Sequence, residues 1–226
     1  PGVGDIFTAA LNAVGILAAV HHRERTGEGQ YVDTAMYDCM VSLAERSVYQ
    51  YSCDGESPTR QGNSHPTLFP YDAFEASDGY VVVAAFSDGH WATLCEAMDR
   101  PDLAADYPDA GSRLASREEL RAEIAAWTRE RESAAILSLL EGRVPSAPVQ
   151  NTADIFADSH IRDREMLADV SQPGADEPMT VAGSPIKMTE TMPEPRGRAP
   201  LLDEHRDELL GQIEAIRDLQ PAGSGD

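Results

Sequence analysis

The first thirty residues contain one long apolar run. Residues 6–20 are apolar on every face of a helix, with only a threonine and an asparagine among them. A helix of this kind is typically enclosed by other parts of a protein. We expect it to run from Asp5 to about Arg25 and to end at Gly27, because basic residues in the last turn and a following glycine favour a helix C-terminus. The run is shorter than the roughly 20 residues that cross a bilayer, so we expect no membrane-spanning segment.

After Gly27 the apolar positions fall into shorter groups. Residues 30–36 include the β-branched Val32 and Thr34 and predict a short strand, and residues 37–51 predict a helix. A segment rich in glycine, proline, serine and asparagine then predicts a loop and a domain junction.

The middle of the chain has the clearest strand pattern. Residues 79–86 read GYVVVAAF, and residues 72–86 predict a hairpin with Asp78 and Gly79 at its turn. Helical spacing returns afterwards, and the chain ends in an amphipathic helix. The remaining expectations are helices over 90–100, 116–131 and 132–143, a turn-rich connector over 144–156, a strand over 179–188 and a terminal helix over 199–219.

The charge of the chain is strongly negative. Eighteen basic and 39 acidic residues give a formal net charge of −21, and Lys187 is the single lysine. Such a surface repels nucleic acid phosphates and anionic lipids, so we expect neither nucleic acid nor a membrane as a partner. Two explanations of this charged composition stay open. One is a salt-loving organism, where high ionic strength screens the repulsion between carboxylates, and the other is a GC-rich genome that favours arginine codons over lysine codons. The amount of acid favours the first.

The cysteines and histidines indicate neither a disulfide framework nor a metal site. Cys39, Cys53 and Cys95 are odd in number and widely spaced, which fits neither a disulfide scaffold nor a zinc signature. We therefore expect a reducing, cytoplasmic compartment, small core roles for all three thiols, and no metal.

Asp5 is the candidate for chemistry. An aspartate directly before an apolar helix is a preferred N-cap, and that structural role would suffice for most such residues. Gly2 and Gly4 flank the position and allow a ligand to approach the backbone closely. The N–H groups of a helix N-terminus also stabilise an anion beside it, so cap and catalyst both stay open from the pattern alone.

The same region carries a family resemblance. Gly4-Asp5, the apolar helix, RERTGEGQ (23–30) and Val32-Asp33 together resemble the signature of the class III CoA-transferases. The similarity continues, in order, over nearly the whole chain. Its further stretches are YDAFEASDGYVVVAAF, LCEAMDRPDL, VPSAPV and APLLDEHRDELL.

The resemblance implies a reaction. In this family the aspartate of the Gly-Asp pair is the nucleophile, which makes Asp5 the expected catalytic residue. The substrates are then an acyl-CoA thioester and a carboxylic acid acceptor, and no permanently bound cofactor is expected. Covalent catalysis of this kind divides a difficult exchange into easier steps.

The resemblance also implies further substrate-binding residues. The loop RQGNSHPTLFPY matches the family's loop that closes over the aspartyl intermediate, but Ser64 and His65 stand where the family has glycines. Gly62, Asn63, Ser64 and His65 are expected to bind substrate, against the alternative of an ordinary connecting loop. Met36 matches an active-site methionine, against the alternative of a core residue.

The fold implied is α/β, a part of a two-domain enzyme. Residues 1–55 and 146–226 are expected to belong to a large Rossmann-type domain, with a smaller α+β domain over 56–145 inserted between them. Members of the family form interlocked dimers, so a homodimer is expected.

Two other functions stay open. The related α-methylacyl-CoA racemases use the same aspartate as an acid or base, but they carry Glu-Pro where this chain has Ser87-Asp88, which favours transfer. The chain could also be an inactive fragment or an assembly module without its CoA-binding half.

Overall fold

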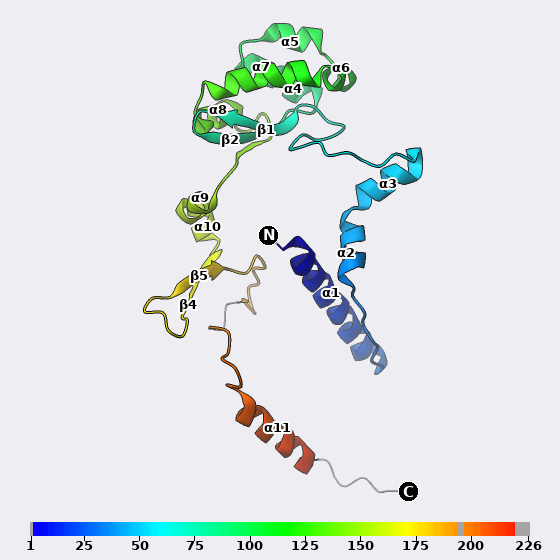
Figure 1. Ribbon diagram of the computed structural model, residues 1–226, viewed down its shortest axis with the longest axis vertical. Coiled ribbons are helices and arrows are strands. Elements are labelled where there is room, and N and C mark those ends of the chain that lie inside the picture. The colour runs from blue at the N-terminus through cyan, green and yellow to red at the C-terminus, as the bar shows by residue number, and fades with distance from the viewer. Residues whose placement is uncertain (1, 194–196, 220–226) are drawn as a thin grey trace. The chain divides into compact units, whose positions relative to one another are not determined.

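The structure, a computed structural model, describes residues 2–193 and 197–219 (Figure 1). Contacts between Cα positions divide the chain into two compact units. The first comprises Pro1–Ala73 and Val83–Glu123, and the second comprises Phe74–Val82 and the chain from Ile124 onward. The three-part domain division expected from the sequence stays a prediction.

The N-terminal helix α1 spans Val3–Thr26. It ends at Gly27, which has φ of 80° and donates its N–H to the carbonyl of Arg23, so the expected C-terminus is confirmed. Its N-cap is Gly2, and Asp5 lies in the first turn. The expectation that Asp5 caps the helix is therefore wrong, because the helix begins two residues earlier than the apolar pattern indicated.

No residue of α1 is buried by the part of the chain that the structure describes. Ile6 is 65% exposed and Leu17 is 68% exposed. The expected enclosure of this helix is thus not provided by the described residues. With 24 residues and a mean hydropathy of 1.8 over its most apolar window, α1 is long enough to cross a membrane, although core helices of soluble proteins share these properties. Length alone therefore does not exclude a membrane span.

An extended segment connects α1 to two short helices. Residues 28–35 belong to no strand, so the strand expected over 30–36 is wrong. The segment lies against α1 instead of another strand: the Thr34 hydroxyl donates to Asn12 Oδ1 at 3.2 Å. A strand needs a neighbouring backbone to pair its N–H and C=O groups. Helix α2 (Met36–Leu43) and helix α3 (Glu45–Asp54) follow, where one helix was expected.

A three-stranded sheet with the order β1-β2-β3 lies in the middle of the chain. Strands β1 (Tyr71–Ala76) and β2 (Gly79–Ala84) form the expected hairpin, but its turn lies at Ser77 and Asp78 and not at Asp78 and Gly79, because Gly79 already begins β2. The third strand, β3 (Ser146–Pro148), continues to Val149, whose N–H donates to the carbonyl of Tyr80 at 2.9 Å. Burial alternates along β1, so one face of it, which carries Asp72, Phe74 and Ala76, is buried.

Five helices follow the hairpin. The first, fourth and fifth confirm the helices expected over 90–100, 116–131 and 132–143, and the second and third lie where no helix was expected. Ser87 caps the first of them by accepting the N–H of His90. Their apolar faces supply many of the buried side chains, among them Trp91, Leu94, Leu120, Ile124, Ile136 and Leu140. The helices are α4 (Asp88–Ala97), α5 (Pro101–Asp106), α6 (Ala110–Ala115), α7 (Arg117–Arg129) and α8 (Ser133–Leu140).

Arg113 on α6 is a fully buried cation in the first unit. Its guanidinium donates to the carbonyls of Phe69, Tyr107 and Phe86 at 3.4 Å each and to Asp88 Oδ1 at 2.8 Å. A buried charge is tolerated when its donors are satisfied in this way. Arg113 therefore ties together the loop before β1, the end of β2 and the start of α4.

The C-terminal part contains helices α9 (Thr152–Ala157) and α10 (Ser159–Asp163) and an antiparallel pair, β4 (Leu167–Val170) and β5 (Met179–Ala182). The strand expected over 179–188 is thus shorter than its pattern. Helix α11 (Arg206–Leu219) confirms the terminal helix but begins seven residues later than position 199. The whole described chain is a mixed helix and sheet structure.

Candidate functional site

Asp5 is exposed in the first turn of α1. A Cβ atom on Gly2 would lie 3.0 Å from Asp5 Oδ2, so glycine at this position leaves the carboxylate room to fold back over the start of the helix. The free N–H groups and the partial positive charge of a helix N-terminus favour negative charge here. The carboxylate is therefore accessible and stands in a local field that stabilises anions.

Met36 lies next to this turn. A Cβ atom on Gly4 would lie 3.7 Å from the sulfur atoms of both Met36 and Met40. Met36 is the first residue of α2, not part of a strand, and it is about half exposed. The structure thus places Met36 beside Gly4, the residue that precedes Asp5 in the chain, and the active-site roles of Asp5 and Met36 stay predictions.

The loop of residues 62–65 is held by its own backbone. Gly62 has φ of 66°, a left-handed conformation that favours glycine, and the Ser64 N–H donates to the carbonyl of Gln61. Ser64 is buried, and its hydroxyl has no hydrogen-bond partner within the described chain. Asn63 is exposed at the tip of the loop.

His65 anchors the end of this loop. Its Nδ1 accepts the N–H groups of Thr67 at 3.3 Å and Leu68 at 3.1 Å, and its ring stacks on Tyr71 with centroids 5.4 Å apart. Burial and the charge of Arg46 lower the pKa of His65 below its ordinary value. A ring nitrogen that accepts two hydrogen bonds carries no proton, so His65 is neutral and orders the chain that follows it. It is not a simple surface residue.

The site residues expected from the sequence thus form two groups. One group is the first turn of α1, which contains Asp5 and whose Gly4 lies beside Met36, and the other is the loop Gly62, Asn63, Ser64 and His65. Among the described contacts, none joins Asp5 to the loop.

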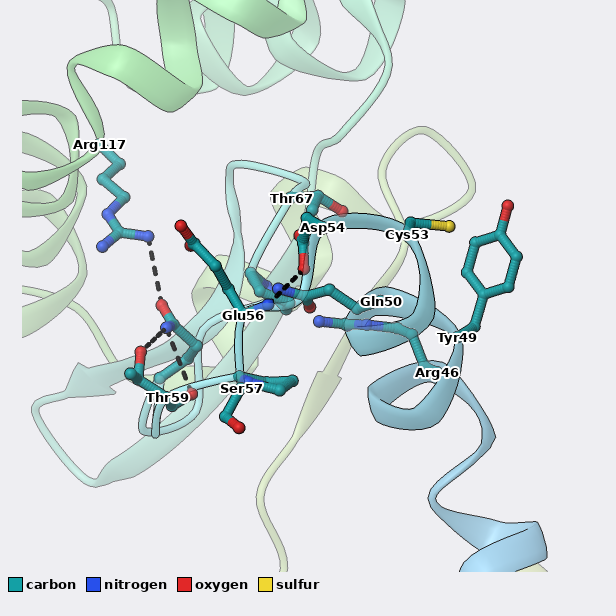
Figure 2. Close-up of a pocket in the computed structure, with 13 residues that line it drawn as sticks. Arg46, Tyr49, Gln50, Cys53, Asp54, Glu56, Ser57, Thr59, Thr67 and Arg117 are labelled. Carbon is teal, nitrogen blue, oxygen red and sulfur yellow. Dashed lines mark hydrogen bonds between the residues drawn. The ribbon is translucent and has the colours of Figure 1, made fainter.

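A cavity of about 650 Å³ lies beside the loop (Figure 2). Arg46 and Gln50 of α3 line it from one element, and Arg117 of α7 lines it from another. Gln61 and Thr67, which lie on either side of the loop, also line the cavity. Sequence reasoning missed this cavity, because its residues belong to no motif and come from separate elements.

The cysteines differ from one another in their surroundings. Cys39 and Cys95 are buried, as expected, and burial raises the pKa of the Cys95 thiol to about 12. Cys53 is exposed and lines the cavity, so its expected core role is wrong. In the described part of the chain, no three histidine, cysteine or carboxylate side chains gather to hold a metal ion.

Comparison with known proteins gives consistent matches. The sequence pattern of CoA-transferase family III matches residues 1–206. The succinyl-CoA:mesaconate CoA-transferase of Haloarcula hispanica is 82% identical over 212 residues, which cover 94% of this chain and 54% of that protein. The succinate–glutarate CoA-transferase of Agrobacterium fabrum is 30% identical over 219 residues, covering 95% of this chain and 54% of that protein.

The fold is also found among solved structures. The crystal structure of a CAIB/BAIF family protein from Brucella suis matches with a TM-score of 0.76 and 30% identity. The match covers 93% of this chain and 55% of that one. The chain therefore spans about half the length of the curated relatives it matches.

Proposed function

We propose a function from one premise: this chain belongs to CoA-transferase family III. The protein moves CoA from an acyl-CoA thioester to the carboxylate of an acceptor acid, and Asp5 is its nucleophile. The observation that carries this proposal is the 82% identity to a relative named as a succinyl-CoA:mesaconate CoA-transferase. The exposed position of Asp5 at the first turn of α1 supports its role.

The proposed reaction has four steps, in which Asp5 is covalently modified in the first and restored only in the last. The Asp5 carboxylate attacks the thioester carbonyl, which forms a mixed anhydride and releases CoA thiolate. The thiolate attacks the aspartyl carbonyl, which forms an aspartyl-CoA thioester and frees the donor acid. The acceptor carboxylate then attacks this thioester, forming a second anhydride and thiolate, and the thiolate takes the acceptor acyl group and leaves Asp5 free.

The local structure supports these steps. Each attack places negative charge on a carbonyl oxygen close to the start of α1, where unpaired N–H groups stabilise an oxyanion. Met36, next to Gly4, offers an apolar wall for the thioester. We assign Gly62, Asn63, Ser64 and His65 to the loop that covers the aspartyl intermediate, with its end ordered by His65 Nδ1.

The substrates we propose are dicarboxylic acids and their CoA thioesters. The two relatives described above are named for succinyl-CoA and mesaconate and for succinate and glutarate, all of which carry a second carboxyl group. We assign this substrate class to the present chain because of its sequence identity to these relatives.

We also propose the assembly that the family implies. The exposed apolar side chains of α1, including Ile6 and Leu17, would be covered by a Rossmann-type large domain in an interlocked homodimer. In this arrangement α1 is a core helix and not a membrane span, and the protein is cytoplasmic. The hydrogen bond between Thr34 and Asn12 supports this, because it gives α1 a polar contact within the protein.

Covalent trapping at Asp5 tests the proposed function. We expect the full-length protein, incubated with succinyl-CoA and quenched with hydroxylamine, to carry a hydroxamate at Asp5 in peptide mass spectrometry. Asp5→Asn should abolish trapping and lower kcat by about 10³-fold or more, because the amide cannot attack the thioester. The matched control is Asp207→Asn, because Asp207 is an exposed carboxylate in the first turn of α11. This variant should leave trapping at Asp5 and kcat unchanged.

Two outcomes would contradict the proposal. Unchanged CoA transfer in Asp5→Asn would show that Asp5 is not the nucleophile. Exchange of the α-proton of an acyl-CoA with deuterated water, without transfer that depends on an acceptor acid, would indicate racemisation.

A further inference from the structure

Two arginines face the cavity beside the loop (Figure 2). Arg46 extends from the first turns of α3, and Arg117 is the first residue of α7. Both belong to the first compact unit. In a chain with 18 basic and 39 acidic residues, two cations at one cavity are a marked departure from the average surface.

The charge of Arg46 is not neutralised locally. Within the described chain Arg46 takes part in no ion pair or side-chain hydrogen bond, and its charge reaches His65, whose pKa it helps to lower. An arginine has five N–H donors in a planar fork that fits a carboxylate or a phosphate. Its donors are therefore available to a ligand in the cavity.

Arg117 is partly engaged but keeps free donors. Its Nη1 donates to Gln61 Oε1 at 3.3 Å, and its Nε lies 3.5 Å from the exposed carboxylate of Glu118. Gln61 in turn donates to the carbonyl and the hydroxyl of Thr59. These bonds orient the Arg117 side chain along the cavity wall and leave Nη2 free of a partner in the described chain.

The cavity is continuous with the substrate loop. Gln61 precedes Gly62 and both Pro66 and Thr67 follow His65, and all three line the cavity. The residues that flank the loop on both sides are thus part of the cavity wall. A substrate covered by the loop would therefore lie next to this cavity.

Two carboxylates also line the cavity. Asp54 Oδ1 accepts the N–H of Glu56, which uses it within the turn after α3. The Glu56 side chain is exposed. Within the described chain neither carboxylate forms an ion pair with Arg46 or Arg117, and Asp54 Oδ1 is used by the backbone.

We propose that this cavity binds an oxyanion of the substrate away from the reacting carbonyl, with Arg46 and Arg117 as its specificity-determining residues. The inference rests on the proposed function. The shared chemistry is that of a carboxylate or phosphate, and it has two sources: the second carboxylate of a dicarboxylic acid, or a phosphate group of CoA. Charge-assisted hydrogen bonds from guanidinium groups suit either one.

The test is a binding titration with the full-length protein. Isothermal titration with succinate and, separately, with adenosine 3′,5′-bisphosphate should show that at least one of them binds. Arg46→Gln and Arg117→Gln should each weaken that binding about tenfold or more, since each removes a charge-assisted contact. The probe whose binding is weakened in these variants identifies the source of the oxyanion.

The matched control is Arg129→Gln. Arg129 is a largely exposed arginine that pairs with Glu75 in the second unit and does not line the cavity. We expect its variant to bind both probes as the unaltered protein does. Binding of neither probe to the unaltered protein, or unchanged binding in both cavity variants, would overturn the proposal.

Trapping at Asp5 separates this proposal from the proposed function. If the unaltered protein forms the Asp5 adduct while both cavity variants bind the probes normally, the cavity assignment fails and the function stands. If the cavity variants lose binding while the unaltered protein forms no adduct, the nucleophile assignment fails and the anion site stands.

Discussion

At the residue scale, His65 is the clearest example of a side chain whose role depends on its protonation. The two N–H groups that donate to Nδ1 require a neutral ring, and burial with Arg46 lowers its pKa below the ordinary value of 6.5. The unfolded chain therefore takes up a proton on His65 at a higher pH than the folded chain does. The contribution of His65 to the free energy of unfolding is complete above pH 6.5 and declines as the pH falls through that value toward the folded-state pKa.

We predict that His65→Asn reduces this pH dependence. An asparagine Oδ1 can accept the same N–H groups without titrating, so the variant should lose less stability on acidification than the unaltered protein. Urea unfolding on either side of pH 6.5 measures the difference. His65→Phe keeps the ring and loses the acceptor, and should be destabilised by about 1 kcal/mol above pH 6.5, where the contribution of His65 is complete. An equal pH slope in His65→Asn and the unaltered protein would contradict this role.

At the element scale, the β4–β5 pair is closed by Gly183. Its N–H donates to the carbonyl of Met166 at 2.8 Å, directly after the last residue pair of the ladder, Leu167 with Ala182. A Cβ atom on Gly183 would lie 2.3 Å from the carbonyl oxygen of Glu165 and 3.1 Å from the Met166 Cα. Because both are backbone atoms, they cannot move aside without distorting the chain before β4.

We predict that Gly183→Ala destabilises the second unit. The clash should lower the free energy of unfolding by about 1–3 kcal/mol, as overpacking does elsewhere. Gly211→Ala in α11 is the matched control: nothing lies within 4 Å of the added Cβ, and alanine favours the helix by about 1 kcal/mol. The same chemical change should therefore have opposite signs in the two variants when measured by chemical denaturation. A neutral Gly183→Ala would contradict the close packing.

At the scale of the whole molecule, the net charge of −21 dominates. Many carboxylates are exposed, and a minority form ion pairs such as Arg198 with Glu204 or Arg100 with Asp102. The remaining carboxylates repel one another, and this repulsion is greatest in the compact state. Salt screens it, because the Debye length falls from about 10 Å at 0.1 M to about 3 Å at 1 M.

We predict that KCl stabilises the protein. The Tm should rise between about 0.1 M and about 1 M KCl as the repulsion is screened. Differential scanning calorimetry of the full-length protein measures this rise. Sucrose at equal osmolality is the control, because it has no charge to screen. A Tm that stays level or falls with KCl would contradict the role of surface repulsion.

Much of the element order could be predicted from the sequence. The end of α1 at Gly27, the β1–β2 hairpin and the helices after it depend on local signals: a terminal glycine, alternation with a turn, and helical spacing. The strand expected over 30–36 failed because β-branched residues favour extended backbone but do not supply a partner strand. The cap expected at Asp5 failed because helix starts are weakly marked when a glycine precedes them.

The sequence by itself determined the family, the candidate nucleophile and the strongly acidic surface, because motifs and charge are properties of residue order and composition. Only the tertiary structure decided that Met36 lies beside Gly4, that His65 is a neutral acceptor, and that Arg46 and Arg117 share one cavity. The first and third of these findings are relations between residues that are distant in the chain, and the second depends on the direction of two hydrogen bonds. Local pattern carries no information on them, since it does not specify which faces of separate elements meet.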